Sequence, residues 1–160
     1  VNAFNGEVGT GLDITDGEHR PFPEIARRYH EAGISWIAIG DENMGEGSSR
    51  EHAAMEPRFR GCKIILAKSF ARIAQTNLKK QGMLALTFND KADYNLIQED
   101  DVFDICGLKT FSPSKVLTLI AHHADGSKNE IIVNHTFNKN QIEWFNTSSL
   151  SLKKCSLAIF

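Results

Sequence analysis

The sequence predicts an α/β fold, because segments with the pattern of strands alternate with segments with the pattern of helices. Three short apolar runs have the length and composition of buried strands, at 34–39, 62–67 and 84–88. Helical patterns precede and separate them, at 21–33, from 49 onward and at 69–82. This alternation is typical of α/β domains.

The predicted helices have recognisable signals at their ends. In the first helix, Pro23 suits the first turn and Gly33 suits the C-terminal cap. The helix after residue 49 is expected to stop near Pro57, whose ring clashes with the preceding turn. Ser69 is predicted to cap the third helix. That helix should carry three apolar side chains inward, those of Phe70, Ile73 and Leu78.

The second half of the chain is predicted to consist mostly of strands. Strand patterns lie at 102–105, 116–122 and 130–134, and Asp125-Gly126 is a hairpin turn signal before the last of them. Asn138 can cap a final helix in which Trp144 and Phe145 are expected to pack in the core. Lys79-Lys80 is expected to be a solvated helix end.

The chain is expected to form one domain with short extensions. At 160 residues and 41% hydrophobic composition it can build a single core. We predict a linker or irregular lead-in over 1–20, the domain proper over 21–147 and a tail over 148–160. The chain begins at Val1, so we expect a fragment or a processed product.

Composition argues against two classes of partner. The net charge of -2 argues against a general nucleic-acid binder, and no apolar run approaches the length of a membrane span. Charge is nevertheless uneven, since 57–89 holds seven Lys or Arg and no Asp or Glu. Three cysteines, Cys62, Cys106 and Cys155, are widely spaced, which favours reduced thiols.

A glycine-rich loop at 40–52 is the strongest candidate for a functional site. It follows a predicted strand and leads into a predicted helix, with Ser48 and Glu51 spaced as a capping box. That spacing places Ser49 and Arg50 in the first helical turn, where free N–H groups and the helix dipole favour an anion. Loops of this kind also serve only to turn the chain, and the pattern alone leaves that alternative open.

The chain closely resembles the C-terminal swivelling domain of aconitase, of the mitochondrial type. The resemblance is carried by the run from Ile39 to Ala54, and it continues through 68–73, 76–82, 86–88, 92–94, 134–138 and 141–145. It implies a three-layer β/β/α fold. It also implies that Ser48 is the base that removes a carbon proton from citrate or isocitrate, while Ser49 and Arg50 contact substrate carboxylates.

The resemblance further implies what the chain works with. Aconitases hold a four-iron four-sulfur cluster on three cysteines of their other domains, so we expect a [4Fe–4S] cluster in the complete enzyme and no cluster ligand in this chain. The expected partners are a tricarboxylate substrate and cluster-bearing domains, supplied in cis or in trans. The isolated chain is expected to be inactive. The implied compartment is the mitochondrial matrix, with the cytoplasm as the alternative.

Departures from the family pattern keep two alternatives open. Ala74 and Gln75 stand where the family has His-Glu, and a substrate-binding arginine of the family lies outside the chain. One alternative is the separate small subunit of a two-chain hydro-lyase such as isopropylmalate isomerase. The other is a non-catalytic relic or regulatory domain, for which RNA binding is disfavoured by the acidic balance.

Overall fold

The computed structural model describes residues 1–47, 51–148 and 157–159, and the side chains of the first two ranges up to 147. The predicted alternation of strands and helices is confirmed up to residue 88. A hairpin of β1 (Thr10–Asp13) and β2 (Glu18–Pro21) precedes α1 (Phe22–Ala32) and β3 (Trp36–Gly40). These are followed by α2 (His52–Phe59), β4 (Cys62–Ala67), α3 (Arg72–Lys80) and β5 (Leu84–Phe88).

The second half contains the predicted strands and the final helix. After the 3-10 helix η1 (Lys91–Leu96) come β6 (Val102–Cys106), the 3-10 helix η2 (Leu108–Thr110), β7 (Leu117–His122) and β8 (Lys128–Asn134). Then follow α4 (Lys139–Ser148) and β9 (Leu157–Ile159). As predicted, Asn138 caps α4: its Oδ1 accepts a hydrogen bond from the backbone N–H of Gln141 at 2.9 Å, and the Gln141 side chain bonds back to the N–H of Asn138 at 3.1 Å.

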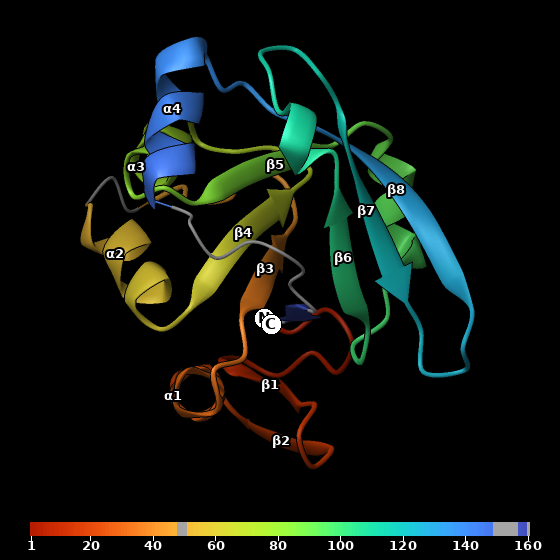
Figure 1. The fold of residues 1–160 in the computed structure, drawn as a ribbon. Helices are drawn as coiled ribbons and strands as arrows, with labels where there is room; N and C mark the ends of the chain where they lie inside the picture. Colours follow the sequence, from red (N-terminus) through yellow and green to blue (C-terminus); the bar gives the residue numbers. More distant parts are fainter. Residues whose placement is uncertain (48–50, 149–156, 160) are drawn as a thin grey trace.

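The strands pair in the order β3-β4-β5-β8-β7-β6-β9, and β9 closes the ring by pairing with β3. The strands β3, β4 and β5 are parallel, whereas the pairings β5-β8, β8-β7 and β7-β6 are antiparallel. Figure 1 shows β3, β4 and β5 as one layer and β6, β7 and β8 as a second layer facing it.

Two apolar clusters join three layers, which confirms the expected β/β/α arrangement. The larger cluster lies between the two strand layers and includes Ile64, Leu86, Phe103, Leu119 and Ile131, all fully buried. The second cluster packs α1, α2 and α3 on the other face of β3, β4 and β5, through residues that include Tyr29, Ala54, Ile65, Leu78 and Ala85. Leu84, Ala85 and Leu86 alternate between the clusters, as successive residues of a strand point to opposite faces.

Several local expectations are wrong. Ile73 and Trp144 are 56% and 53% exposed, although both were expected to point inward. Lys79 is buried rather than solvated, and its Nζ donates hydrogen bonds to the backbone oxygen and the hydroxyl of Thr136. Helical periodicity predicts only approximately which face of a helix is buried. In α3, the contacts of Lys79 with Thr136 and with the Phe137 ring bury a side chain that was expected to be solvated.

Regular structure also occurs in the two extensions. The hairpin β1–β2 lies largely within 1–20, where we expected no regular pattern, and β9 lies within 148–160. Each of these strands is only three or four residues long, too short for hydrophobic periodicity to predict it. The division of the chain at residues 20 and 147 stays a prediction.

Candidate functional site

The glycine loop leaves β3 at the edge of the sheet where three parallel strands end. Since β3, β4 and β5 run in the same direction, their carboxyl ends meet there. Residues 41–47 follow β3, Lys68 and Ser69 follow β4, and 89–91 follow β5. In α/β proteins, ligands commonly bind at the carboxyl ends of parallel strands, because the loops there converge.

The three predicted site residues, Ser48, Ser49 and Arg50, lie outside the described residues. Gly47 is described directly before them and Glu51 directly after them. The contacts of the two flanking segments therefore show how each end of the candidate site is held.

Ser69 ties the first part of the loop to the end of β4. Its Oγ accepts a hydrogen bond from the backbone N–H of Asn43 at 2.8 Å and donates one to Glu42 Oε2 at 2.6 Å. Two backbone hydrogen bonds join the same segments, from Met44 N–H to Ser69 O at 2.9 Å and from Ala71 N–H to Met44 O at 3.0 Å. The loop is thus fastened through both side chains and backbone.

This position of Ser69 corrects the prediction that it caps the third helix. The helix α3 begins at Arg72, and its N-cap Ala71 makes no side-chain capping bond. Asn43 has a φ of 53°, a left-handed conformation that few residues other than glycine adopt. The Ser69 hydroxyl therefore holds a strained residue of the loop, which helix-capping statistics do not reveal.

Two lysines neutralise the two carboxylates at the start of the loop. Lys68 Nζ lies 2.8 Å from Asp41 Oδ1 and 4.1 Å from the centre of the Tyr94 ring. Lys91 Nζ lies 2.6 Å from Glu42 Oε1. The Lys68 hydrogen bond lowers the pKa of Asp41, and hydrogen bonds from Lys91 and then Ser69 lower the pKa of Glu42. Both acids are therefore ionised at neutral pH and paired.

The glycines of the loop are required by its backbone. Gly45 has a φ of 88°, and a Cβ built there would lie 2.3 Å from Ala74 Cβ of α3. Gly47 has a φ of 90°, but a Cβ there would meet nothing within 4 Å. Gly45 thus lets the loop touch α3, whereas Gly47 only lets the chain turn.

The helix after the loop is described from His52 onward. The helix α2 spans His52–Phe59 with Glu51 as its N-cap residue, and the predicted start at Ser49 and Arg50 lies outside the described residues. The helix also continues through Pro57 to Phe59, where the N–H of Arg60 bonds to Glu56 O at 3.2 Å. A proline disturbs only the helical turn before it, and little more than one turn of α2 precedes Pro57.

Glu51 is held from the other side of the candidate site. Its Oε1 accepts a hydrogen bond from Gln81 Nε2 at 3.1 Å, and Gln81 is the C-cap residue of α3. Both flanks of the 48–50 segment are therefore tied to the ends of α3. Sequence reasoning missed Lys68, Ser69, Lys91 and Gln81 as supports of the loop. The available signal was their position in the sequence: Lys68 and Ser69 follow β4, Gln81 follows α3, and Lys91 is the third residue after β5.

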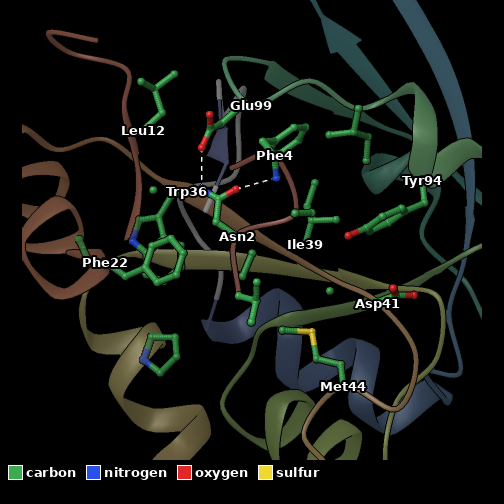
Figure 2. Close-up of a pocket in the computed structure, with 18 of the residues that line it drawn as sticks. Asn2, Phe4, Leu12, Phe22, Trp36, Ile39, Asp41, Met44, Tyr94 and Glu99 are labelled. Atoms are coloured by element: carbon green, nitrogen blue, oxygen red, sulfur yellow. Dashed lines mark hydrogen bonds between the residues drawn. The ribbon is translucent and has the colours of Figure 1, made fainter. Parts of the chain in front are cut away.

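A cavity of about 880 Å³ lies beside the root of this loop. Figure 2 shows Asp41 and Met44 at one end of it and Leu12 and Phe22 at the other. Asn2 and Glu99 also line it: Asn2 Nδ2 donates a hydrogen bond to Glu99 Oε1 at 2.6 Å and the N–H of Phe4 donates one to Asn2 Oδ1 at 2.8 Å (Figure 2). The lining is therefore mixed, with apolar side chains beside the charged groups of Asp41, Glu56, Glu99 and Arg60.

The described residues do not fit an iron–sulfur cluster. Within 1–47 and 51–147, no group of three His, Cys, Asp or Glu residues could hold a metal ion. Cys62 is fully buried, and burial raises the pKa of its thiol to about 12. Cys106 is exposed and unpaired, and Cys155 lies outside the described residues. Across the described helices, none is long and apolar enough to cross a membrane.

Comparison with known proteins gives related sequences over almost the whole chain. The chain is 54% identical to a probable mitochondrial aconitate hydratase of Caenorhabditis elegans over 149 residues, and 53% identical to the mitochondrial aconitate hydratase of Schizosaccharomyces pombe over 150. It is 50% identical to that of Saccharomyces cerevisiae over 149 residues. Each match covers 93% of this chain but only 19% of the relative, so the chain spans about a fifth of their length.

A solved structure and a family profile complete the comparison. The 3-isopropylmalate dehydratase of Methanocaldococcus jannaschii aligns with a TM-score of 0.47 and 22% identity, over 70% of this chain and 58% of that one. Residues 2–91 match the family described as "Aconitase C-terminal domain". This chain belongs to the aconitase C-terminal domain family.

Proposed function

We propose that this chain is the substrate-binding and catalytic-base domain of an aconitase-like hydro-lyase, which interconverts citrate and isocitrate through cis-aconitate. The observation that carries the proposal is the sequence Gly47-Ser48-Ser49-Arg50, in a chain 54% identical to a probable aconitate hydratase. The described flanks of this motif lie at the carboxyl ends of three parallel strands, where such sheets bind their ligands.

In this reaction Ser48 accepts the proton of the substrate carbon. A serine hydroxyl is a weak base, so the alkoxide must be stabilised before it can act. The guanidinium of Arg50, two residues along, supplies positive charge for this purpose, and it can also bind a substrate carboxylate through two parallel hydrogen bonds. Ser49 adds a hydroxyl donor for a second carboxylate. Loss of the hydroxyl from the neighbouring carbon is left to groups outside this chain.

The chain works, in this proposal, with cluster-bearing domains supplied in cis or in trans. The relatives that it matches are about five times as long, and the described residues offer no ligand set for a [4Fe–4S] cluster. We therefore expect the isolated chain to be inactive. The relatives are named as mitochondrial enzymes, which supports the mitochondrial matrix as its compartment.

A chimeric enzyme tests this proposal. The matching 149 residues of the Saccharomyces cerevisiae aconitate hydratase are replaced by this chain, and cis-aconitate formation from citrate and from isocitrate is measured. We expect turnover in the chimera and a loss of about 10²- to 10⁴-fold in kcat for Ser48→Ala, the usual contribution of a general base. Ser127→Ala, in the distant β7–β8 turn, is the matched control. A folded, cluster-loaded chimera without turnover would overturn the proposal.

A further inference from the structure

We infer that Ser69, supported by Lys68, is a positioning residue that orders the 41–47 loop, the segment directly before the proposed base in the sequence. This inference rests on the proposed function, because it assigns Ser69 a part in the reaction of Ser48. It concerns residues that neither the motif nor the family match marks as part of a site. Its basis is the convergence of side-chain hydrogen bonds, ion pairs and backbone strain on one short loop.

The Ser69 hydroxyl makes two contacts that no apolar side chain can replace. As acceptor it binds the N–H of Asn43, and as donor it binds the Glu42 carboxylate. A hydroxyl that donates and accepts at once fixes the direction of both bonds. Without it, the Asn43 N–H and the left-handed backbone at this residue lose their one side-chain partner among the described hydrogen bonds.

Lys68 supports the same segment one residue earlier along the loop. Its ammonium is held between the Asp41 carboxylate and the face of the Tyr94 ring, so it joins the loop to η1 as well as to β4. The Lys68 side chain is only 20% exposed, whereas Lys91 on Glu42 is 58% exposed. Of the two lysines, Lys68 is therefore the more firmly placed and has the larger expected effect on the loop.

The connection to Ser48 follows from chain geometry. Asn43 and Ser48 are five residues apart, and between them Gly45 is pressed against Ala74 of α3. Beyond Arg50, Glu51 is tied to Gln81. The described segments on both sides of 48–50 are therefore anchored, and we expect loosening of the first anchor to disturb the proposed base. Misplacement of a reacting group by about 1 Å can cost about 10²-fold in rate.

Two measurements test the inference, one on this chain and one on the chimera. In the chain, hydrogen exchange by mass spectrometry follows the amides of 43–47 in the wild type, Ser69→Ala and Ser69→Thr. We expect Ser69→Ala to speed exchange there about tenfold or more, and Ser69→Thr, which keeps a hydroxyl, to restore protection. Ser127→Ala removes a serine hydroxyl that also donates to a carboxylate, that of Asp125 at 2.5 Å, and should leave 43–47 unchanged.

In the chimera, Ser69→Ala should lower kcat about tenfold or more while KM changes by less than about threefold, because substrate contacts remain and the base is misplaced. Ser69→Thr should recover most of the rate. Faster loop exchange with an unchanged kcat would overturn the inference and leave the proposed function intact, since Ser48→Ala would still remove activity. Unchanged exchange in Ser69→Ala would overturn the inference whether or not the chimera turns over.

Discussion

Polar side chains hold the molecule together in two regions, and they do so in opposite ways. At the carboxyl ends of β3, β4 and β5, Asp41 and Glu42 pair with lysines while their side chains remain 63% and 48% exposed. At the start of β6, the Asp101 carboxylate is fully buried and lies 2.5 Å from Nδ1 of His123, whose side chain is 3% exposed. The exposed network holds a loop, and the buried pair holds strands.

From this difference we infer that the exposed network serves the proposed function and that the buried pair serves stability. Exposed ion pairs contribute little to folding, because water and salt screen them, but they can orient a loop at low cost. A buried pair is costly to leave half-made, and this one joins three strands, since His123 Nε2 also lies 2.8 Å from Oδ1 of Asn129 in β8. We therefore expect mutations in the second region to affect unfolding and mutations in the first to affect the reaction.

The largest effect on stability is expected for His123→Ala. This change leaves the Asp101 carboxylate buried, with the backbone N–H of Gln98 as its remaining partner, and should cost about 3–5 kcal/mol. The neighbouring His122 lies 2.9 Å from Asp104 in an exposed pair, so His122→Ala should cost no more than about 1 kcal/mol. Urea unfolding of the three proteins measures both values, and equal costs would refute the contrast between the two kinds of pair.

A smaller but distinct effect is expected for the loop glycines. Gly47→Ala introduces only left-handed strain, about 1–2 kcal/mol. Gly45→Ala adds a collision of the new methyl group with Ala74 Cβ, so its cost should exceed that of Gly47→Ala by at least about 1 kcal/mol. Thermal unfolding monitored by circular dichroism compares the two variants. If they unfold alike, the contact between the loop and α3 is not tight.

The buried pair also predicts a pH dependence. Hydrogen bonds to Asn129 and then to Asp101 raise the pKa of His123 above its ordinary value of 6.5. A raised pKa means that the pair contributes its full stability below about pH 6.5 and loses it as the pH rises through the folded-state pKa. Wild-type stability should therefore decline as the pH rises past 6.5 and through the folded-state pKa of His123. His123→Gln should lack this decline, and a parallel decline in that variant would assign it to another group.

The smallest effect on stability is expected for the two lysines that pair with the loop, Lys68 and Lys91. Replacing Lys68 should nevertheless change the kinetics of the reaction. Lys68→Met leaves the Asp41 carboxylate unpaired in the loop that precedes the proposed substrate-binding residues, so KM for citrate in the chimera should rise by up to about fivefold. The increase should shrink at high salt. Lys115→Met, whose partner is the neutral hydroxyl of Thr110, serves as the control. Equal responses from the two variants would show a general charge effect.

Sequence reasoning predicted most elements because their signals are local. Pro23 and Gly33 mark the two ends of α1, the apolar run 62–67 is β4, and Asn138 caps α4 through Gln141. It failed where a partner far along the chain decides the outcome. Ser69 suits a helix cap by its residue type, yet Asn43 and Glu42 occupy its hydroxyl. Lys79 suits a solvated end, yet Thr136 binds its ammonium.

The candidate site divides in the same way. Its central residues, Ser48, Ser49 and Arg50, come from the motif and the family, and their roles remain proposals. Its supports became visible only in three dimensions, because Lys68, Ser69, Lys91 and Gln81 lie 18 or more positions further along the chain. No spacing rule connects residues so far apart.

By itself, the sequence determined the α/β class, the order of the strands and helices, and membership of the aconitase C-terminal domain family, because hydrophobic period, turn chemistry and motif are properties of short segments. Only the tertiary structure decided which carboxylates face lysines and which histidine is buried with its acid. Those outcomes depend on which strand ends meet, and the free energy of pairing or burying a charge is set by neighbours that the local sequence does not contain.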